Sequence, residues 1–181
     1  MFSKIIKKGT FALRGGVKSS YDYDYGLLSD AMSRAYCRML NYKLNHWQSI
    51  HGKLNVVVGI ETQGIRIGLE LADLMSVPFI LVPHEQSHLH QLEIPKFSPD
   101  THWLIVDDIV TTGQTFIRTL NYLEIDEKPE SITFACMIRR NPNNLDYSTV
   151  FGDRSKAELH IVDHRFDFID KRLVSLFNEP E

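Results

Sequence analysis

Two adjacent acids and a hydroxyl-rich turn form the stretch of this sequence with the clearest chemical potential. Asp107 and Asp108 follow a short apolar run over 103–106, which is typical of a strand buried on both faces of a parallel sheet. Because neighbouring carboxylates are costly to bury without partners, we expect them at the carboxyl end of that strand, facing a cleft. A turn over 111–115 comes next, and apolar residues at helical spacing over 116–123 predict a helix.

The order strand, acidic pair, turn and helix suits a ligand that carries both phosphate and hydroxyl groups. The N–H groups at a helix N-terminus bind anions, and threonine hydroxyls add donors for phosphate oxygens. The carboxylates can accept hydrogen bonds from sugar hydroxyls or attract a hydrated Mg²⁺. We therefore predict a sugar phosphate ligand. The alternative is an ordinary α/β domain with an acid at a strand end and a threonine cap, in which case the whole order is accidental.

A second strand–turn–helix unit lies earlier in the chain. The run 55–60 predicts a buried strand, a polar turn lies between Gly59 and Gly64, and an amphipathic helix extends to about Met75. This glycine spacing alone is weak evidence for phosphate binding, since no lysine follows as in a nucleotide triphosphate loop. Together with the acidic element, it indicates a second anion site.

The segment Ile105–Thr115 resembles the phosphoribosyl pyrophosphate (PRPP) signature of type I phosphoribosyltransferases. The resemblance implies that Asp107 and Asp108 are the catalytic pair and hold the ribose 2′- and 3′-hydroxyls. It also implies that one turn wraps the 5′-phosphate, through Thr111, Thr112, Gly113, Gln114 and Thr115. Gln114 stands where the family often has a small residue.

In the same family, the earlier turn binds pyrophosphate. The resemblance carries that role onto Glu61, Thr62, Gln63 and Gly64. It also predicts a cis peptide bond, not followed by proline, between Glu61 and Thr62. Mg²⁺ is the implied cofactor.

The accepting base is predicted from two arginines. By spacing, Phe11–Tyr23 is a hairpin, and it also resembles the amino-terminal segment of orotate phosphoribosyltransferases, which forms a hood over the base. Arg14 takes the place of the family's lysine in that segment. Arg140, at the end of a predicted strand over 131–138, takes the place of an arginine that grips the orotate carboxylate. The alternatives are a peripheral hairpin and arginines solvated beside a turn.

The polar segment 83–100 is predicted to be a mobile loop. It carries His84, His88 and His90, but no matching cluster accompanies them elsewhere, so no metal site is predicted there. The loop that orotate phosphoribosyltransferases close over pyrophosphate is rich in basic residues, whereas this one has Lys96 alone. The departure leaves three interpretations open: weak activity, another substrate, or histidines that act as cations when protonated.

Composition places the chain among globular proteins. Its 181 residues suit one domain over 1–181, with a hood segment at 1–25; 43% are hydrophobic and 24% charged. The net charge of −3 gives no footprint for nucleic acid or a membrane surface, and no apolar stretch is long enough to span a bilayer. The five basic residues among the first twenty could face a polyanionic ligand or form a solvated, fraying terminus, and the second interpretation is favoured for Lys4–Lys8. Cys37 and Cys136 are expected to be buried free thiols, and the protein is expected in the cytoplasm.

The remaining periodicity completes the predicted architecture. A packing helix is expected from Tyr25 to about Leu44, a strand over 77–82, a short strand over 159–164, and a closing helix or tail over 166–177. Strands alternating with helices predict an α/β fold. It is a single doubly wound domain with a mostly parallel sheet flanked by helices, resembling the type I phosphoribosyltransferase fold with a small N-terminal hood.

The resemblance implies transfer of ribose 5-phosphate from PRPP to a nucleobase, with orotate first among the candidates. It also implies a homodimer, and the aromatic residues of Tyr21–Tyr25 look exposed. Two alternatives remain: an enzyme that uses PRPP with another base, and a protein that binds PRPP without turnover.

Overall fold

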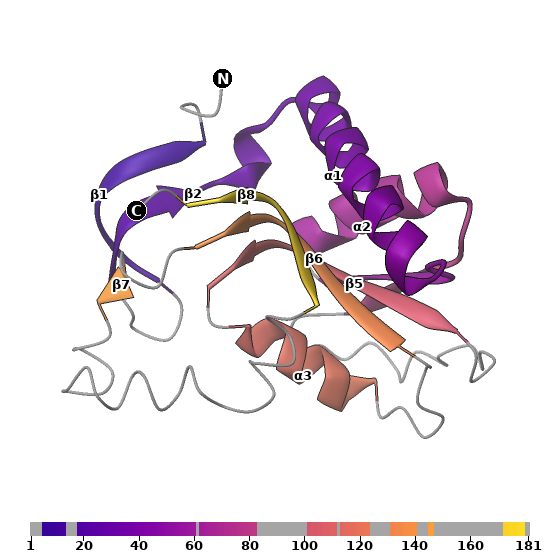
Figure 1. Cartoon of the computed structure of the whole chain (residues 1–181). Helices are drawn as coiled ribbons and strands as arrows, with labels where there is room; N and C mark the ends of the chain where they lie inside the picture. Colours follow the sequence, from indigo (N-terminus) through magenta and orange to yellow (C-terminus); the bar gives the residue numbers. More distant parts are fainter. Residues whose placement is uncertain are drawn as a thin grey trace.

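The fold is built on a five-stranded, all-parallel sheet with the strand order β4-β3-β5-β6-β8. The computed structural model describes residues 5–13, 18–60, 62–82, 101–111, 113–123, 131–140, 145–146 and 172–179. The strands are β3 (Val56–Ile60), β4 (Phe79–Val82), β5 (His102–Val110), β6 (Ser131–Arg139) and β8 (Leu173–Asn178). The predicted doubly wound α/β fold is confirmed, with helices on both faces of the sheet (Figure 1).

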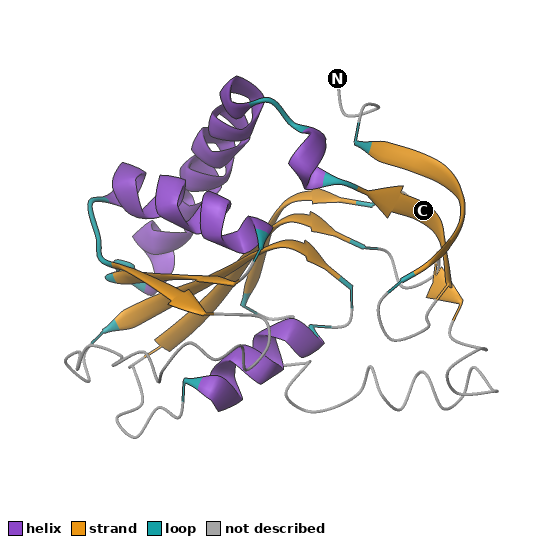
Figure 2. Ribbon diagram, turned by 180° about the vertical axis from the view of Figure 1, so that it is seen from behind, coloured by secondary structure: helices purple, strands orange, loops and turns teal. Residues whose placement is uncertain are grey.

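Three helices cover the sheet. The helices α1 (Asp30–His51) and α2 (Gln63–Met75) pack on one face, and α3 (Gln114–Tyr122) packs on the other (Figures 1 and 2). The hydroxyl of Ser29 caps α1 by accepting from the backbone N–H of Met32, and the helix ends at Gly52, whose φ is 104°. The helix thus runs seven residues beyond Leu44, because no glycine or proline stops it earlier.

The sheet separates two apolar cores, as the alternation of side chains along a strand requires. On β3, Val57 faces the core under α1 and α2, whereas Val56 and Val58 face the core over α3. Both faces of the central strands are therefore buried, which explains why their sequences are almost continuously apolar.

The hood is a small antiparallel sheet, β1-β2-β7, made from β1 (Ile6–Ala12), β2 (Lys18–Tyr23) and β7 (Leu145–Asp146). It lies beyond the carboxyl ends of the parallel strands, whose arrows point toward it in Figure 2. Among the described residues, no backbone ladder joins it to the five-stranded sheet. Side-chain contacts therefore connect the two sheets.

Three expectations are wrong: a fraying N-terminus, a closing helix near the C-terminus, and exposed aromatic residues near Tyr23. Lys7 and Lys8 lie in β1, paired with Asp22 and Tyr21, so this part of the terminus is an ordered strand whose lysines are exposed. The residues Leu173–Asn178 form a parallel strand beside β6 instead of a closing helix, because long-range pairing decides between the two periods. The aromatic side chains of Tyr23 and Tyr25 are buried, at 6% and 1% exposure. The predicted strand over 159–164 lies outside the described residues.

The two cysteines are free and fully buried, as predicted. Burial raises the pKa of the Cys37 thiol to about 11, and burial also raises the pKa of Cys136. Neither thiol ionises at neutral pH, so both act as small apolar groups in the core.

Candidate active site

The candidate site lies where the direction of the sheet's winding reverses. The chain passes from β3 to β4 on one side and then returns to place β5 on the other side of β3. In doubly wound sheets this switch point, at the carboxyl ends of the strands, opens a crevice for a ligand. The helix α2 follows β3, and α3 follows the neighbouring strand β5. The two helices lie on opposite faces of the sheet (Figure 1).

Glycines bring the turn before α2 directly against β5. A Cβ atom added at Gly64 would lie 2.6 Å from the carbonyl oxygen of Val106 and 3.3 Å from Cα of Asp107. A Cβ atom on Gly59 would lie 2.8 Å from the carbonyl oxygen of Gly64. Because real side chains do not tolerate such distances, only glycine permits this contact. The predicted pyrophosphate turn therefore abuts the predicted catalytic strand.

Asp107 and Asp108 lie within β5, which continues to Val110, so the prediction that they end the strand is wrong. The reason is that the ladder with β6 continues past them, with Asp107 opposite Cys136. On the other side, the ladder with β3 ends at Val106. The acids thus begin where β3 stops covering β5, beside the turn that follows β3.

The acids are held by their own backbone. One oxygen of Asp107 accepts from the N–H of Asp108 at 2.9 Å, and one oxygen of Asp108 accepts from the N–H of Ile109 at 2.9 Å. Burial raises the pKa of Asp108, although the Asp107 side chain, the Ile109 N–H and the charge of Arg140 act in the opposite direction. Asp107 is only 8% exposed. A carboxylate whose pKa is raised by burial, next to a second carboxylate that is buried, is the kind of group that active sites contain.

The turn after β5 has the geometry that the sequence predicts. Gly113 has a φ of 73°, a value that favours glycine, and its carbonyl oxygen accepts from the N–H of Ile117 at 3.1 Å to begin α3. Thr111, Gln114 and Thr115 flank it at the end of β5 and the start of α3. This turn and the turn before α2 therefore both lead into helix N-termini at the same edge of the sheet.

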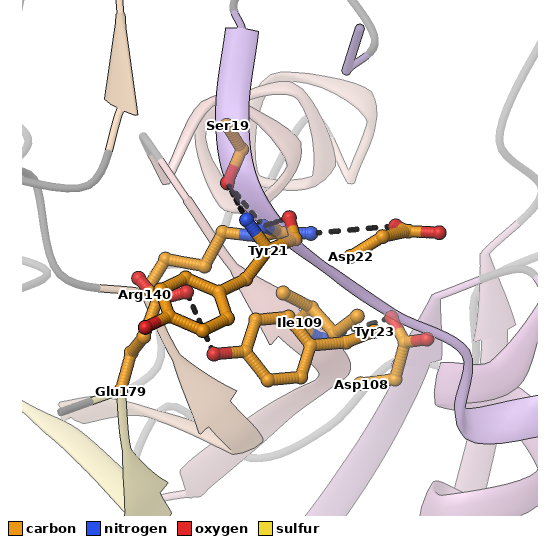
Figure 3. Close-up of polar contacts among 8 residues, drawn as sticks. All are labelled: Ser19, Tyr21, Asp22, Tyr23, Asp108, Ile109, Arg140 and Glu179. Carbon is orange, nitrogen blue, oxygen red and sulfur yellow. Dashed lines mark hydrogen bonds and ion pairs between the residues drawn. The ribbon is translucent and has the colours of Figure 1, made fainter. Parts of the chain in front are cut away.

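Arg140 connects the end of β6 to the hood (Figure 3). Its Nη1 donates to the hydroxyl of Ser19 at 3.1 Å and to the carbonyl oxygen of Tyr21 at 2.8 Å. Its Nη2 lies 3.8 Å from a carboxylate oxygen of Asp22, and its guanidinium stacks 4.8 Å from the centre of the Tyr23 ring. The residue is 4% exposed, so the interpretation that it is solvated beside a turn is wrong.

One donor of this arginine has no partner among the described residues. The Nε atom of Arg140 is buried and makes no hydrogen bond within that part of the chain. Burial lowers the pKa of Arg140, and Glu179, Tyr23, Asp22 and Asp108 oppose that effect. The guanidinium keeps its charge at neutral pH. A buried, charged group with an unsatisfied donor is costly, and a ligand acceptor would remove that cost.

The segment that follows the hood contacts the start of α2. A Cβ atom added at Gly26 would lie 3.2 Å from Nε2 of Gln63 and 3.2 Å from a carboxylate oxygen of Asp24. The side chain of Gln63 therefore reaches the short helix η2 (Tyr25–Leu27), which follows the hood. The structure thus places Gly64 against the backbone of Asp107, and Arg140 near enough to Asp108 for its charge to lower the pKa of that acid.

Several predicted site residues lie outside the described residues: Arg14, Glu61, Thr112, His84, His88 and His90. The predicted cis bond at Glu61–Thr62 lies there too. Thr62 precedes α2 and is exposed. Within the described ranges, no group of three or more histidine, cysteine or acidic residues could hold a metal ion. No helix in that part of the chain is long and apolar enough to cross a membrane.

Four residues around Arg140 were not predicted as site residues: Ser19, Asp22, Tyr23 and Glu179. Ser19, Asp22 and Tyr23 belong to the hood segment Phe11–Tyr23, but no role was predicted for them. No sequence signal points to Glu179, because its contact with Tyr23 spans 156 residues.

A family model described as "Phosphoribosyl transferase domain" matches residues 33–154. The chain belongs to the type I phosphoribosyltransferase family. Two relatives illustrate the range of similarity. An "Orotate phosphoribosyltransferase" of Thermoplasma acidophilum is 27% identical over 119 residues, which cover 65% of this chain and 66% of the relative. A "Bifunctional protein PyrR" of Latilactobacillus sakei is 27% identical over 143 residues, covering 68% of this chain and 70% of that protein.

Solved structures share the fold at lower identity. An orotate phosphoribosyltransferase from Aeropyrum pernix matches with a TM-score of 0.64 and 18% identity, covering 98% of this chain and 91% of that one. An adenine phosphoribosyltransferase from Trypanosoma brucei matches with a TM-score of 0.61 and 13% identity, covering 98% and 78%. These matches establish the phosphoribosyltransferase fold, which structures named for different bases share.

Proposed function

We propose that this protein transfers ribose 5-phosphate from PRPP to a nucleobase and releases pyrophosphate. The observation that carries the proposal is the contact of Gly64 with the backbone of Val106 and Asp107. It joins the turn proposed for pyrophosphate to the strand proposed for ribose. A ligand with a phosphate on one side of a sugar and a pyrophosphate on the other would use both turns and both acids.

Each part of the site has a proposed role. Asp107 and Asp108 accept hydrogen bonds from the ribose 2′- and 3′-hydroxyls. The turn Thr111–Thr115 binds the 5′-phosphate with backbone N–H groups at the start of α3, and the turn over 61–64 binds pyrophosphate in the same way before α2. Carboxylate oxygens are the ligands that Mg²⁺ prefers, so this donor set fits the metal. When bound, Mg²⁺ would neutralise charge on the pyrophosphate.

The reaction follows from these contacts. A ring nitrogen of the base forms a bond to C1 of the ribose while the bond from C1 to pyrophosphate breaks, and the positive charge in between spreads over the sugar ring. Pyrophosphate leaves with the electron pair of the broken bond, and the nitrogen gives up its proton to solvent. The protein contributes mostly by positioning the two reactants and by electrostatic stabilisation. In their proposed role at the ribose hydroxyls, Asp107 and Asp108 would also stabilise the positive charge on the sugar.

Orotate is the base that we propose first. Arg140 offers a buried Nε donor that no described residue accepts from, next to an Nη2 whose ion pair with Asp22 is loose at 3.8 Å. Two donors on one edge of a guanidinium match the two oxygens of a carboxylate. Arg14 of the hood segment is the second proposed contact to the base.

A second candidate, a PRPP-binding protein without turnover, is favoured by one observation. The segment 83–100 contains a single lysine, Lys96, whereas stabilisation of departing pyrophosphate benefits from several cations. The residues His84, His88 and His90 could supply charge only when protonated.

The test is release of pyrophosphate from PRPP and Mg²⁺ with orotate, uracil, hypoxanthine and adenine. We expect release with orotate, and a loss on the order of 10²- to 10³-fold in Asp107→Asn and Asp108→Asn. The exposed Asp73→Asn is the control and should leave the rate unchanged. Silence with every base, together with calorimetric PRPP binding that the acid variants lack, would establish the binding protein instead.

We also propose a homodimer. Its support is an exposed apolar stripe on α1, with Met39 at 49%, Tyr42 at 79% and Ile50 at 65% exposure. Light scattering of the wild type and of Tyr42→Asp measures it, and a dimer that the substitution leaves intact would exclude this helix from the interface.

A further inference from the structure

A chain of buried contacts joins the end of β8 to Arg140 through the hood. The Tyr23 hydroxyl donates to a carboxylate oxygen of Glu179 at 2.6 Å, and the Tyr23 ring lies under the Arg140 guanidinium at 4.8 Å (Figure 3). Glu179 and Tyr23 are each 6% exposed. Three segments that are distant in the sequence therefore meet at one guanidinium group.

The contacts of Arg140 divide its donors into two sets. Ser19 and the carbonyl oxygen of Tyr21 hold Nη1, and the Tyr23 ring supports the face of the guanidinium. The Nε atom remains buried, and no residue in the described part of the chain accepts from it. One fixed nitrogen and one supported face define the plane of a guanidinium group. The Tyr23 ring thus decides the direction in which the remaining donors point.

Glu179 in turn fixes the position of Tyr23. The backbone N–H of Glu179 donates to the carbonyl oxygen of Arg139 at 2.8 Å, so its carboxylate is anchored beside the residue that precedes Arg140. A hydrogen bond to a carboxylate is stronger than one between neutral groups, and it places the ring through its hydroxyl. The same bond makes the phenol more electron-rich, which strengthens the attraction between its ring and a cation.

We propose that Glu179 and Tyr23 are positioning residues that hold the Arg140 guanidinium in the orientation that binds the base. The proposal rests on the proposed transfer to a base that Arg140 contacts. It assigns a part in base recognition to two residues outside both phosphate-binding turns. Neither side chain needs to touch the substrate.

The experiment compares Tyr23→Phe and Glu179→Gln with the wild type in steady-state kinetics with orotate. Tyr23→Phe keeps the ring and removes the hydroxyl, whereas Glu179→Gln keeps an acceptor and removes the charge. We expect each to raise KM for orotate about 5-fold while kcat and KM for PRPP change less than about 2-fold. Tyr25→Phe is the matched control, because its buried hydroxyl also has a side-chain partner, Ser33 at 3.0 Å, but it does not contact Arg140.

A double-mutant cycle separates positioning from mere stabilisation of the fold. In an Arg140→Lys background, which keeps the charge and removes the planar fork, Glu179→Gln should have no further effect on KM. An equal rise in KM in both backgrounds would overturn the proposal. A lowered unfolding midpoint with unchanged KM in the two single variants would overturn it too, since it shows a structural role alone.

A readout without turnover keeps this test separate from that of the proposed function. The Arg140 Nε–H group gives a nitrogen-15 NMR signal that can be assigned by its loss in Arg140→Lys. We expect Tyr23→Phe and Glu179→Gln to shift that signal and Tyr25→Phe to leave it in place. An unmoved signal in all three variants would overturn the positioning role, even in a protein that proves inactive with every base.

Discussion

The two halves of the candidate site are built by different means. The half proposed for PRPP lies at the ends of β3 and β5, where short stretches of consecutive residues form each turn and backbone atoms touch through Gly64. The half proposed for the base gathers side chains from β2, β6 and the residue after β8 around Arg140. The first half depends on local backbone geometry and the second on contacts over more than one hundred residues. The difference teaches which parts of a site a sequence can reveal.

The largest expected effect concerns the backbone contact in the first half. Gly64→Ala places a Cβ atom 2.6 Å from the carbonyl oxygen of Val106, which belongs to a central strand and cannot move aside cheaply. We expect the free energy of unfolding to fall by about 3 kcal/mol, measured by urea titration. In Gly9→Ala, on the exposed hood strand β1, the added Cβ atom meets only the far end of the Phe11 side chain, at 3.1 Å. This variant should change the free energy of unfolding by less than about 0.5 kcal/mol. Equal losses in the two variants would show that the contact does not distinguish this half.

The next effect concerns the side-chain contacts of the second half. Arg140→Lys removes the hydrogen bonds of Nη1 to Ser19 and to Tyr21. We therefore expect the free energy of unfolding, measured by urea titration, to fall by about 2 kcal/mol. Amide hydrogen exchange should accelerate in β2 much more than in β3, because the hood has no backbone ladder to the larger sheet in the described part of the chain. Arg34→Lys is the control, since its side chain is 67% exposed and its ion pair is long at 3.9 Å. Uniform acceleration in both sheets would argue against a separate attachment of the hood.

A smaller effect tests the burial of Asp108. Its pKa is raised on folding, so its ionised form destabilises the folded state at neutral pH, and this penalty disappears below the unfolded value of about 4, where the group is protonated in both states. The contribution of Asp108 to the free energy of unfolding thus falls as pH rises from its unfolded pKa, about 4, to its raised folded pKa. We expect Asp108→Asn to be more stable than the wild type by about 1 kcal/mol at pH 7 and equal to it near pH 4. Urea titrations at the two pH values measure this, and a gain that persists at pH 4 would point to a cause other than ionisation.

The smallest effect concerns the loose ion pair in the second half. Asp22 lies 3.8 Å from Nη2 of Arg140 with a side chain that is 36% exposed, so its carboxylate competes weakly with an anionic base. We expect Asp22→Asn to lower KM for orotate about 2-fold and to leave KM for an uncharged base unchanged. Steady-state kinetics with both bases measure the difference. An equal change with the two bases would mean that Asp22 acts on the shape of the hood.

The sequence predicted the fold and its two strand–turn–helix units because both depend on local patterns. The apolar runs of β3, β5 and β6 and the glycine turns are visible in consecutive residues. The predicted end of β5 was wrong because its ladder with β6 continues past Asp107 and Asp108. No local sequence pattern records that pairing. The surroundings of Arg140 could not be predicted, since Ser19, Tyr23 and Glu179 meet it only after the hood folds over the sheet. The prediction of a closing helix over Leu173–Asn178 was wrong for the same reason, because pairing with β6 overrides the local pattern of this segment.

The attachment of the hood by side chains has an evolutionary consequence. Substitutions in β2, at the end of β6 or after β8 can remodel the surroundings of Arg140 while the glycine turns and acids of β3 and β5 stay as they are. Under the proposed function, a descendant of this protein could accept a different base after a few substitutions around Arg140. The proposed contacts to the sugar and its phosphates would be inherited unchanged. Diversification of the acceptor is built into the way in which the two sheets meet.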